Sequence, residues 1–217
     1  RLSGMNLIID DTDHPLIIKV ASIQSARMQV YFIDNDDFFQ NRLQIVDEQG
    51  NEYEDNGERA IFYSRGVLET VKKLRWCPDV IHCHGWMTAL APLYIKKAYK
   101  DEPSFREAKV VISLYDDEFK QPLQEDFASK LMLKGIAKKD LVSLKKEIDY
   151  VALSKLAIEQ ADGVILQSPN INQELVEYAK SLGKPVLEYQ APEAYADACN
   201  DFYDMVMESS NSEETNE

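Results

Sequence analysis

Short apolar segments alternate with helix-like segments over residues 79–207, and no other property of the sequence limits the fold as strongly. The apolar segments are bounded by polar or turn-forming residues and fall at 79–83, 109–114, 163–166 and 185–189. The helix-like segments fall at 87–99, at two or three places within 121–161, and at 171–182 and 192–207. Strands that alternate with helices in this way form parallel sheets covered on both faces. The chain is therefore predicted to be an α/β protein with a doubly wound, mostly parallel sheet.

The residues before this alternating region predict further strands and one long helix. Ile- and Val-rich segments indicate strands at 5–9, 16–23 and 28–33. The connection 24–27 is short enough for a hairpin. A helix is expected over 55–74, where one apolar face collects Ala60, Tyr63, Val67, Val71 and Leu74. Asp55 and Asn56 are expected to cap its start, because their side chains accept hydrogen bonds from the first free amides.

Composition limits the class of partner. The chain has 217 residues, of which 45% are hydrophobic, which suits one α/β domain of ordinary size. It carries 24 basic and 38 acidic side chains, a net charge of −14. Such a surface repels phosphate backbones and anionic lipid, which argues against nucleic-acid or membrane partners. Sugar nucleotides are also anions, so a site for one requires a local positive patch.

The ends and the cysteines give weaker expectations. We expect one domain over 1–208 and a disordered acidic tail over 209–217, which resembles a natural C-terminus. No apolar run reaches the about 20 residues that span a bilayer, and no signal peptide is visible. The three cysteines, of which Cys77 and Cys83 are expected to be buried, are too scattered for a disulfide framework and favour a reducing cytoplasm.

The strongest candidate site follows the strand predicted at 79–83. Ligands of open parallel sheets bind beyond the carboxyl ends of the strands, and this strand runs into His82, His84 and Trp86. We expect the two histidines to point to opposite faces of the strand and so not to share a target. His84 can then hydrogen-bond a sugar hydroxyl, and Trp86 can stack on a sugar ring or pack under the next helix. The alternatives are a strand end with buried histidines, or a metal site with Cys83, for which the spacing is poor.

Three other groups of residues have both a functional and a structural interpretation. The first group is Asp55, Asn56 and Arg59, which either contact a ligand or form a helix cap with an exposed arginine. The aromatic and acidic residues of 31–39 recognise carbohydrate, or they are core and solvated loop. The carboxylates of 116–118 bind metal or act as acid and base, or they reflect the acidity of the chain. Neither a phosphate-binding glycine loop nor a G-x-S-x-G elbow is present, so no cofactor is predicted.

Several segments, taken in order, resemble bacterial glycogen synthases and plant starch synthases, the retaining ADP-glucose-dependent transferases. One is the sequence PDVIHCHGW at 78–86, which is similar to the P-D-V-x-H-x-H-D-W motif of that family. The others are VYFID with Phe38, Phe39 and Arg42, then YEDNGER at 53–59, SRGVLE at 64–69, LSK at 153–155, ADGV at 161–164, and Ser168, Pro169 and Glu174. The order and spacing hold over roughly residues 28–175, which makes the combination specific.

The resemblance implies the fold, the site and the ligands. The family has two Rossmann-like domains in the GT-B arrangement, with the active site between them. This chain resembles the N-terminal half, which receives the α-1,4-glucan acceptor, while the other half holds most of the ADP-glucose or UDP-glucose donor. By position, His84 matches the histidine that contacts the transferred glucose, and His82 and Trp86 shape the same wall.

Departures from the family pattern limit the expected activity. A K-x-G-G-L loop would lie before Arg1, the aspartate of H-D-W is Gly85, and the family's I-H-N segment reads Ile112-Ser113-Leu114. The donor domain is absent, and the leaving diphosphate needs positive charge for its stabilisation. The chain is therefore expected to be incomplete for glucosyl transfer alone. Either residues outside it, including those of a partner chain, supply the donor half, or it is a catalytically silent glycan-binding or regulatory relative.

Overall fold

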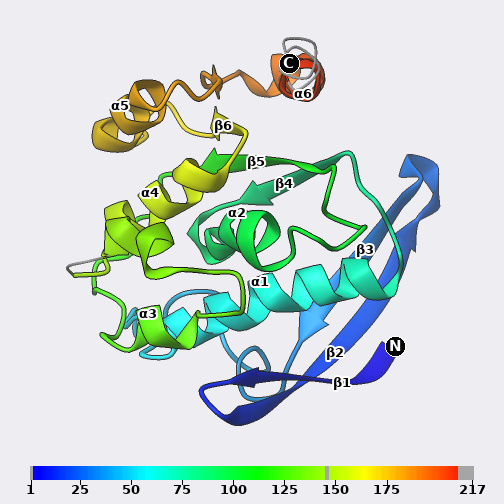
Figure 1. The fold of residues 1–217 in the computed structure, drawn as a ribbon, viewed down its shortest axis with the longest axis vertical. Helices are drawn as coiled ribbons and strands as arrows, with labels where there is room; N and C mark the ends of the chain where they lie inside the picture. Colours follow the sequence, from blue (N-terminus) through cyan, green and yellow to red (C-terminus); the bar gives the residue numbers. More distant parts are fainter. Residues whose placement is uncertain (1, 145–146, 210–217) are drawn as a thin grey trace.

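The computed structural model describes residues 2–144 and 147–209, and within them the strands form two separate sheets with helices packed against both (Figure 1). Most of the predicted tail, from residue 210 onward, lies outside the described residues. Figure 1 shows the sheet of β1–β3 and the last helix, α6, at opposite ends of the molecule. The mixed α/β architecture with a parallel sheet is confirmed.

The first sheet is antiparallel and has the order β1-β2-β3. Its strands are β1 (Leu2–Ile9), β2 (Thr12–Ile23) and β3 (Met28–Asp34), with a 3₁₀ turn over Gln24–Ala26. These strands were expected, and the antiparallel pairing of β2 with β3 confirms the predicted hairpin at 24–27. The three strands form a sheet of their own beside α1 (Asn56–Lys73). Gly66 allows this packing, because a Cβ there would lie 2.9 Å from Ile33 and 3.1 Å from Leu16.

The second sheet is parallel, with the order β4-β5-β6-β7. Its strands are β4 (Val80–His84), β5 (Lys109–Leu114), β6 (Gly163–Leu166) and β7 (Val186–Leu187). The predicted bounds of β5 and β6 are confirmed, and nearly every residue of these two strands is buried. In the pairing of β4 with β5, His82 lies opposite Val111 and His84 opposite Ser113.

Helices cover both faces of the parallel sheet. One face packs in a core with α1, α2 and α4, and α6 packs on the other through Cys199, Phe202 and Val206. The bounds are α2 (Leu90–Leu93), α3 (Phe127–Lys130), α4 (Tyr150–Gln160), α5 (Gln173–Ser181) and α6 (Pro192–Glu208). The single helix expected at 87–99 is instead a 3₁₀ turn at Trp86–Thr88, α2 and a π-helical turn at Tyr94–Ala98. Pro92 lies in α2 and has no backbone N–H to donate to a regular helical hydrogen bond.

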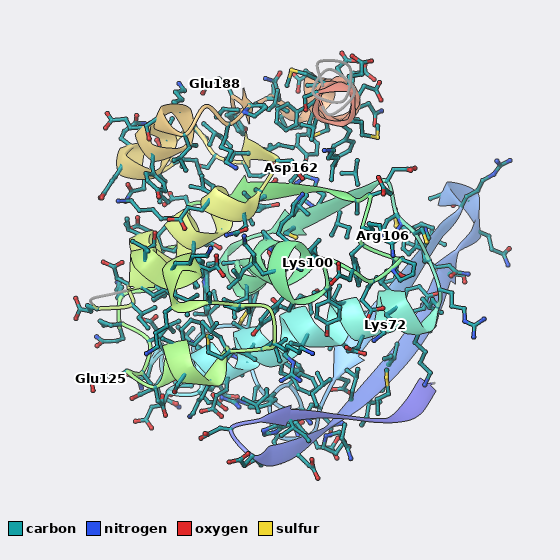
Figure 2. The ribbon with its side chains drawn as sticks, viewed as in Figure 1. Lys72, Lys100, Arg106, Glu125, Asp162 and Glu188 are labelled. Atoms are coloured by element: carbon teal, nitrogen blue, oxygen red, sulfur yellow. The ribbon has the colours of Figure 1, made fainter. Side chains whose placement is uncertain are left out.

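An ion pair fixes the start of β6 against its neighbours. Asp162, labelled in Figure 2, lies just before β6 and accepts a hydrogen bond from the backbone N–H of Val110 at 2.8 Å. The same carboxylate pairs with Lys96 at 2.7 Å. The connection from α4 to β6 is thereby tied to both β5 and the helical segment before it.

The cysteines differ in their exposure to solvent. All three cysteines are free, but Cys77 is exposed, so its predicted burial is wrong, whereas Cys83 and Cys199 are buried. Cys77 follows α1 in a connection that is exposed to solvent from Lys72 onward. In the described part of the chain, none of the helices is long and apolar enough to cross a membrane.

Candidate functional site

The two histidines of β4 lie on the same face of the strand. Their rings are stacked with centroids 3.9 Å apart and planes 26° apart. Residues two apart on a strand share a face, so the expectation of opposite faces is wrong. Cys83 lies between them and is buried on the other side of the strand, which separates the three proposed metal ligands. Among the described residues there is no group of three or more His, Cys, Asp or Glu side chains that could hold a metal ion.

His82 is held by hydroxyl groups on both of its nitrogens. Nδ1 lies 2.5 Å from the Tyr203 hydroxyl, and Nε2 lies 2.5 Å from Ser113 Oγ. A neutral imidazole satisfies both contacts, because it has one donor and one acceptor nitrogen. Burial, with a smaller contribution from His84, lowers the pKa of His82 to about 3, so the ring is neutral near pH 7. His82 therefore positions its neighbour and links β4 to α6.

The hydrogen-bonded chain continues from Ser113 across the sheet. Gln167, at the end of β6, donates from Nε2 to Ser113 Oγ at 3.0 Å and to the Tyr195 hydroxyl at 2.7 Å. Tyr195 and Tyr203 both come from α6. The face of the sheet that carries His82 is thus closed by one helix through two tyrosines.

His84 has a free nitrogen. Its Nδ1 lies 2.8 Å from the Tyr115 hydroxyl, and Nε2 forms no hydrogen bond with any described residue. The residue is exposed, although partial burial of the ring lowers its pKa. A neutral imidazole with one unoccupied nitrogen can donate or accept a hydrogen bond from a ligand.

A cavity of about 430 Å³ lies in front of His84. It is lined by Phe39, Arg42, Leu43, Gln44, Arg59, Tyr63, His84, Met87 and Thr88. A smaller cavity of about 180 Å³ shares Tyr63, His84 and Thr88 with it and extends toward β4. Ser64 lines the inner cavity, and its buried Oγ has no hydrogen-bond partner among the described residues. Together they form a cleft between α1, the 39–44 loop and the end of β4.

Arg59 builds one wall of this cleft. It is 2% exposed. Its guanidinium donates to the carbonyl oxygens of Phe38, Leu43 and Gln44 at 2.9, 3.0 and 2.7 Å, and to Asn56 Oδ1 at 2.8 Å. Asn56 in turn donates to the Ile45 carbonyl at 3.0 Å. The interpretation of Arg59 as an exposed residue beside a helix cap is therefore wrong, because Arg59 and Asn56 hold the 38–45 loop against α1.

Asp55 stands at the start of α1 but its side chain does not cap the helix. Its carboxylate instead accepts two hydrogen bonds from Arg42, at 2.8 and 2.5 Å. This pairing raises the pKa of the Arg42 guanidinium. The predicted helix start is confirmed, whereas the predicted capping bond is wrong because Arg42 occupies both carboxylate oxygens.

The aromatic and acidic segment at 31–39 divides between core and cleft. Asn35 is buried, and its Oδ1 accepts hydrogen bonds from the backbone N–H groups of Asp37 and Phe38. Phe38 packs against Phe62 in the core with ring centroids 5.4 Å apart, whereas Phe39 lines the cavity. Only one of these rings is therefore placed to contact a ligand in the cleft.

The turn after His84 depends on glycine. Gly85 has φ 79° and ψ 171°, a conformation open almost only to glycine. A Cβ there would lie 3.1 Å from Asp117 Oδ2, and burial raises the pKa of that carboxyl group. Trp86 is 3% exposed and packs against Phe119 at 4.8 Å. It supports the turn from inside, and its ring is not open to a sugar.

The segment after β5 contains a contact that the sequence analysis did not identify. Ile112, Ser113 and Leu114 form the buried end of β5, within the strand predicted at 109–114. Tyr115 is the first residue beyond it, and its hydroxyl contacts His84. Tyr115 was missed, although the rule that selected Asp116 also covers it. Tyr203 was missed because it lies in a distant helix with no local signal.

The fold and the cleft together define a class of protein. A parallel sheet with helices on both faces, and with a cleft at the carboxyl end of β4, is a Rossmann-like arrangement, in which ligands bind beyond the carboxyl ends of the strands. The fold is similar to the solved catalytic domain of starch synthase IV from Arabidopsis thaliana bound to ADP and acarbose, with a TM-score of 0.62 at 19% identity. That likeness covers 85% of this chain and 38% of the other. Residues 4–187 match the family described as starch synthase catalytic domain, and the chain belongs to that family.

Sequence relatives agree with this assignment. The glycogen synthase of Pelodictyon phaeoclathratiforme is 29% identical over 195 residues, which are 88% of this chain and 39% of the relative. That of Chlorobaculum tepidum is 32% identical over 178 residues, 82% of this chain and 36% of the relative. That of Chlorobium luteolum is 36% identical over 117 residues, 54% of this chain and 24% of the relative. The chain thus spans well under half the length of these relatives.

Proposed function

We propose that this chain binds an α-1,4-glucan acceptor in the cleft in front of His84, as the acceptor-side half of a glucosyl-transfer site. The cavity of about 430 Å³ lined by His84, whose Nε2 forms no hydrogen bond with a described residue, is the observation that supports this most directly. The glycogen synthase relatives and the family membership support the choice of glucan.

The lining of the cleft suits a neutral sugar. Phe39, Tyr63 and Met87 offer apolar surface to the C–H faces of sugar rings. His84 Nε2 can hydrogen-bond a hydroxyl group. His82 acts as a positioning residue, since it stacks on His84 and holds that ring in one orientation. Trp86 supports the turn that follows His84. Asp55, Asn56 and Arg59 contribute indirectly, because they hold the 38–45 loop in place.

The donor half is proposed to come from residues outside this chain. Transfer from ADP-glucose or UDP-glucose requires positive charge at the leaving diphosphate. In the cleft, Arg42 is paired with Asp55, and Arg59 already donates four hydrogen bonds to the protein. A donor domain, in the same polypeptide or in a partner chain, would supply that charge. The three free cysteines agree with a reducing cytoplasm, and we propose a single domain that includes α6.

A second candidate is a glycan-binding or regulatory protein without transfer activity. Gly85 favours it, because the family motif has an aspartate at this position and the chain has none, and because its backbone conformation is one that other residues rarely adopt. Both candidate functions use the same glucan site, and they differ only in whether glucosyl transfer takes place there.

Calorimetric titration with maltoheptaose tests the glucan site. His84→Ala is expected to weaken binding about tenfold, the equivalent of one hydrogen bond of roughly 1.4 kcal/mol. His84→Gln, which keeps a polar atom near the position of Nε2, should recover part of the affinity. Leu43→Arg places a long side chain at the cavity, and it should fold normally because Leu43 is 52% exposed. Binding that is absent, or unchanged by both His84→Ala and Leu43→Arg, contradicts the proposal.

A transfer assay separates the two candidates. The purified chain, given labelled ADP-glucose or UDP-glucose with glycogen, is expected to incorporate no label. Robust incorporation by this chain alone would show that it carries a complete donor site. Incorporation that appears only with a separate donor-domain protein would support the divided site, and its absence there would favour the silent relative.

A further inference from the structure

A second hollow lies at the other end of β4, between the segment before that strand and α6. It has a volume of about 500 Å³ and is lined by Trp76, Cys77, Pro78, Asp79, Val80, Asn200, Tyr203, Asp204 and Met207. We call it the α6 groove. One side of the groove is made by residues 76–80, which precede or begin β4, and the other side by α6. His84 ends that strand, so the groove and the cleft open at opposite ends of one short strand.

The lining of the α6 groove combines an aromatic platform with polar side chains. Trp76 is 57% exposed, an unusual state for an indole with this much apolar surface. Asp79, Asn200 and Asp204 are exposed, and none of their side chains is hydrogen-bonded or ion-paired within the described residues. These groups can accept and donate hydrogen bonds to a ligand without breaking existing ones.

Charge narrows the class of ligand. The lining holds two carboxylates and neither lysine nor arginine. An anion such as a sugar nucleotide is therefore repelled, in a chain whose net charge is already −14. A neutral polyhydroxylated molecule fits, because its C–H face covers the indole while its hydroxyl groups reach the carboxylates and the amide.

The α6 groove lies partly outside the region that the family model matches. The family match covers residues 4–187, and α6 runs from Pro192 to Glu208. Four of the nine lining residues, from Asn200 to Met207, therefore come from a helix outside the matched region. A site here would be additional to the acceptor cleft.

One side chain joins the α6 groove to the cleft. Tyr203 lines the groove, and its hydroxyl lies 2.5 Å from His82 Nδ1. His82 stacks on His84 at 3.9 Å, and His84 lines the cavity in front of it. A ligand that contacts Tyr203 is thus two side chains away from the cleft.

We propose that the α6 groove is a second carbohydrate site, which binds a segment of a neutral glucan with one sugar ring on Trp76. Asp79, Asn200 and Asp204 hydrogen-bond its hydroxyl groups. The choice of glucan rests on the proposed function, whereas the existence of a neutral-sugar site rests on the groove itself.

Tryptophan fluorescence gives a direct test. Trp76 and Trp86 are the two tryptophans of the chain, and Trp86 is only 3% exposed. Maltoheptaose is expected to cause a saturable blue shift of the emission, since it covers Trp76. Trp76→Phe should lose most of that shift, and Asn200→Ala with Asp204→Ala should weaken it at least tenfold. Met205→Ala is the matched control, because Met205 is exposed on the same helix outside the groove and should leave the titration unchanged. Thermal unfolding of each variant checks that it folds.

The outcomes separate this site from the cleft. A shift that survives Leu43→Arg but is lost in Trp76→Phe, Asn200→Ala and Asp204→Ala supports the α6 groove even if the cleft proposal fails. A shift absent from the full chain, or unaffected by the groove variants, overturns the groove while leaving calorimetric binding at the cleft intact. Binding of a lysine-rich peptide that is lost in Asp79→Asn and Asp204→Asn, without any maltoheptaose binding at the groove, overturns the carbohydrate assignment.

Discussion

Arg59 and His84 line the same cavity, yet the protein uses them in opposite ways. Arg59 is 2% exposed and donates four hydrogen bonds to carbonyl and amide oxygens of the protein. His84 is exposed and has one polar contact, from Nδ1 to Tyr115, with Nε2 free. In the sequence both are polar residues at an element boundary. The comparison shows how the two roles can be told apart. A residue whose donors are all used within the protein builds the site, whereas a residue with an unused nitrogen can bind a ligand.

The largest expected effect falls on the Arg59 side. Arg59→Ala leaves the carbonyl oxygens of Phe38, Leu43 and Gln44 without their partner in a buried position. We expect the free energy of unfolding to fall by about 3 to 5 kcal/mol, as measured by urea denaturation. Arg59→Lys, which keeps the charge but lacks the planar fork, should recover only part of it. A loss below about 1 kcal/mol would show that Arg59 is not the support of the loop.

Acid is expected to act on the histidine side. Unfolded His82 takes up a proton below its ordinary pKa of 6.5, whereas folded His82 stays neutral until about pH 3. The unfolded state therefore binds more protons in this window, and stability falls as the pH decreases from 6.5 toward 3. His82 contributes about 1 kcal/mol per pH unit to this loss of unfolding free energy. The value is below the maximum for one titrating group because the ring is partly exposed to solvent. Urea unfolding at several pH values should show a shallower acid dependence in His82→Gln, and equal slopes would contradict the buried neutral ring.

A smaller effect is expected for Arg42, which lies beside Arg59 on the same wall. Its pair with Asp55 is only partly buried, with side-chain exposures of 19% and 32%. Arg42→Ala should cost about 1 kcal/mol of unfolding free energy. Measured in the same urea series, this loss sharpens the comparison between a partly buried ion pair and a fully buried guanidinium. A loss as large as that of Arg59→Ala would place the support of the loop in the ion pair instead.

The smallest expected effect on stability belongs to His84. His84→Ala removes one hydrogen bond and one ring stack at an exposed position, so the free energy of unfolding should change by about 0.5 kcal/mol or less. Its effect on glucan affinity is expected to be larger. A stability loss comparable to that of Arg59→Ala would remove the distinction between the two residues.

The elements that could be predicted are those that carry their own signal. The bounds of β5 and β6 follow from short runs of apolar residues, because strands buried on both faces need no polar alternation. The start of α1 follows from Asp55 and Asn56. The hairpin of β2 and β3 follows from the short connection 24–27. That the sheet of β1–β3 does not pair with the parallel sheet depends on tertiary packing, which these segments do not reveal alone.

The position of His84 was predicted correctly, but the arrangement of the side chains around it was not. His84 lies at the end of β4 beside a cavity, as the position of the motif indicated. The shared face of His82 and His84 follows from the two-residue period of a strand, so the contrary expectation misapplied that rule and did not lack information. The burial of Arg59 and the contact of Tyr203 with His82 depend on tertiary packing, which local patterns do not contain.

The contact between His82 and Tyr203 also bears on how the protein is made. The two residues are 121 positions apart, and a chain leaves the ribosome from its N-terminus. When β4 and β5 first pair, the helix that covers their apolar face has not yet been synthesised. Contacts of such long sequence separation form late, and an uncovered sheet face invites aggregation meanwhile. Nascent chains halted before α6 should therefore recruit chaperones more strongly than the finished protein does.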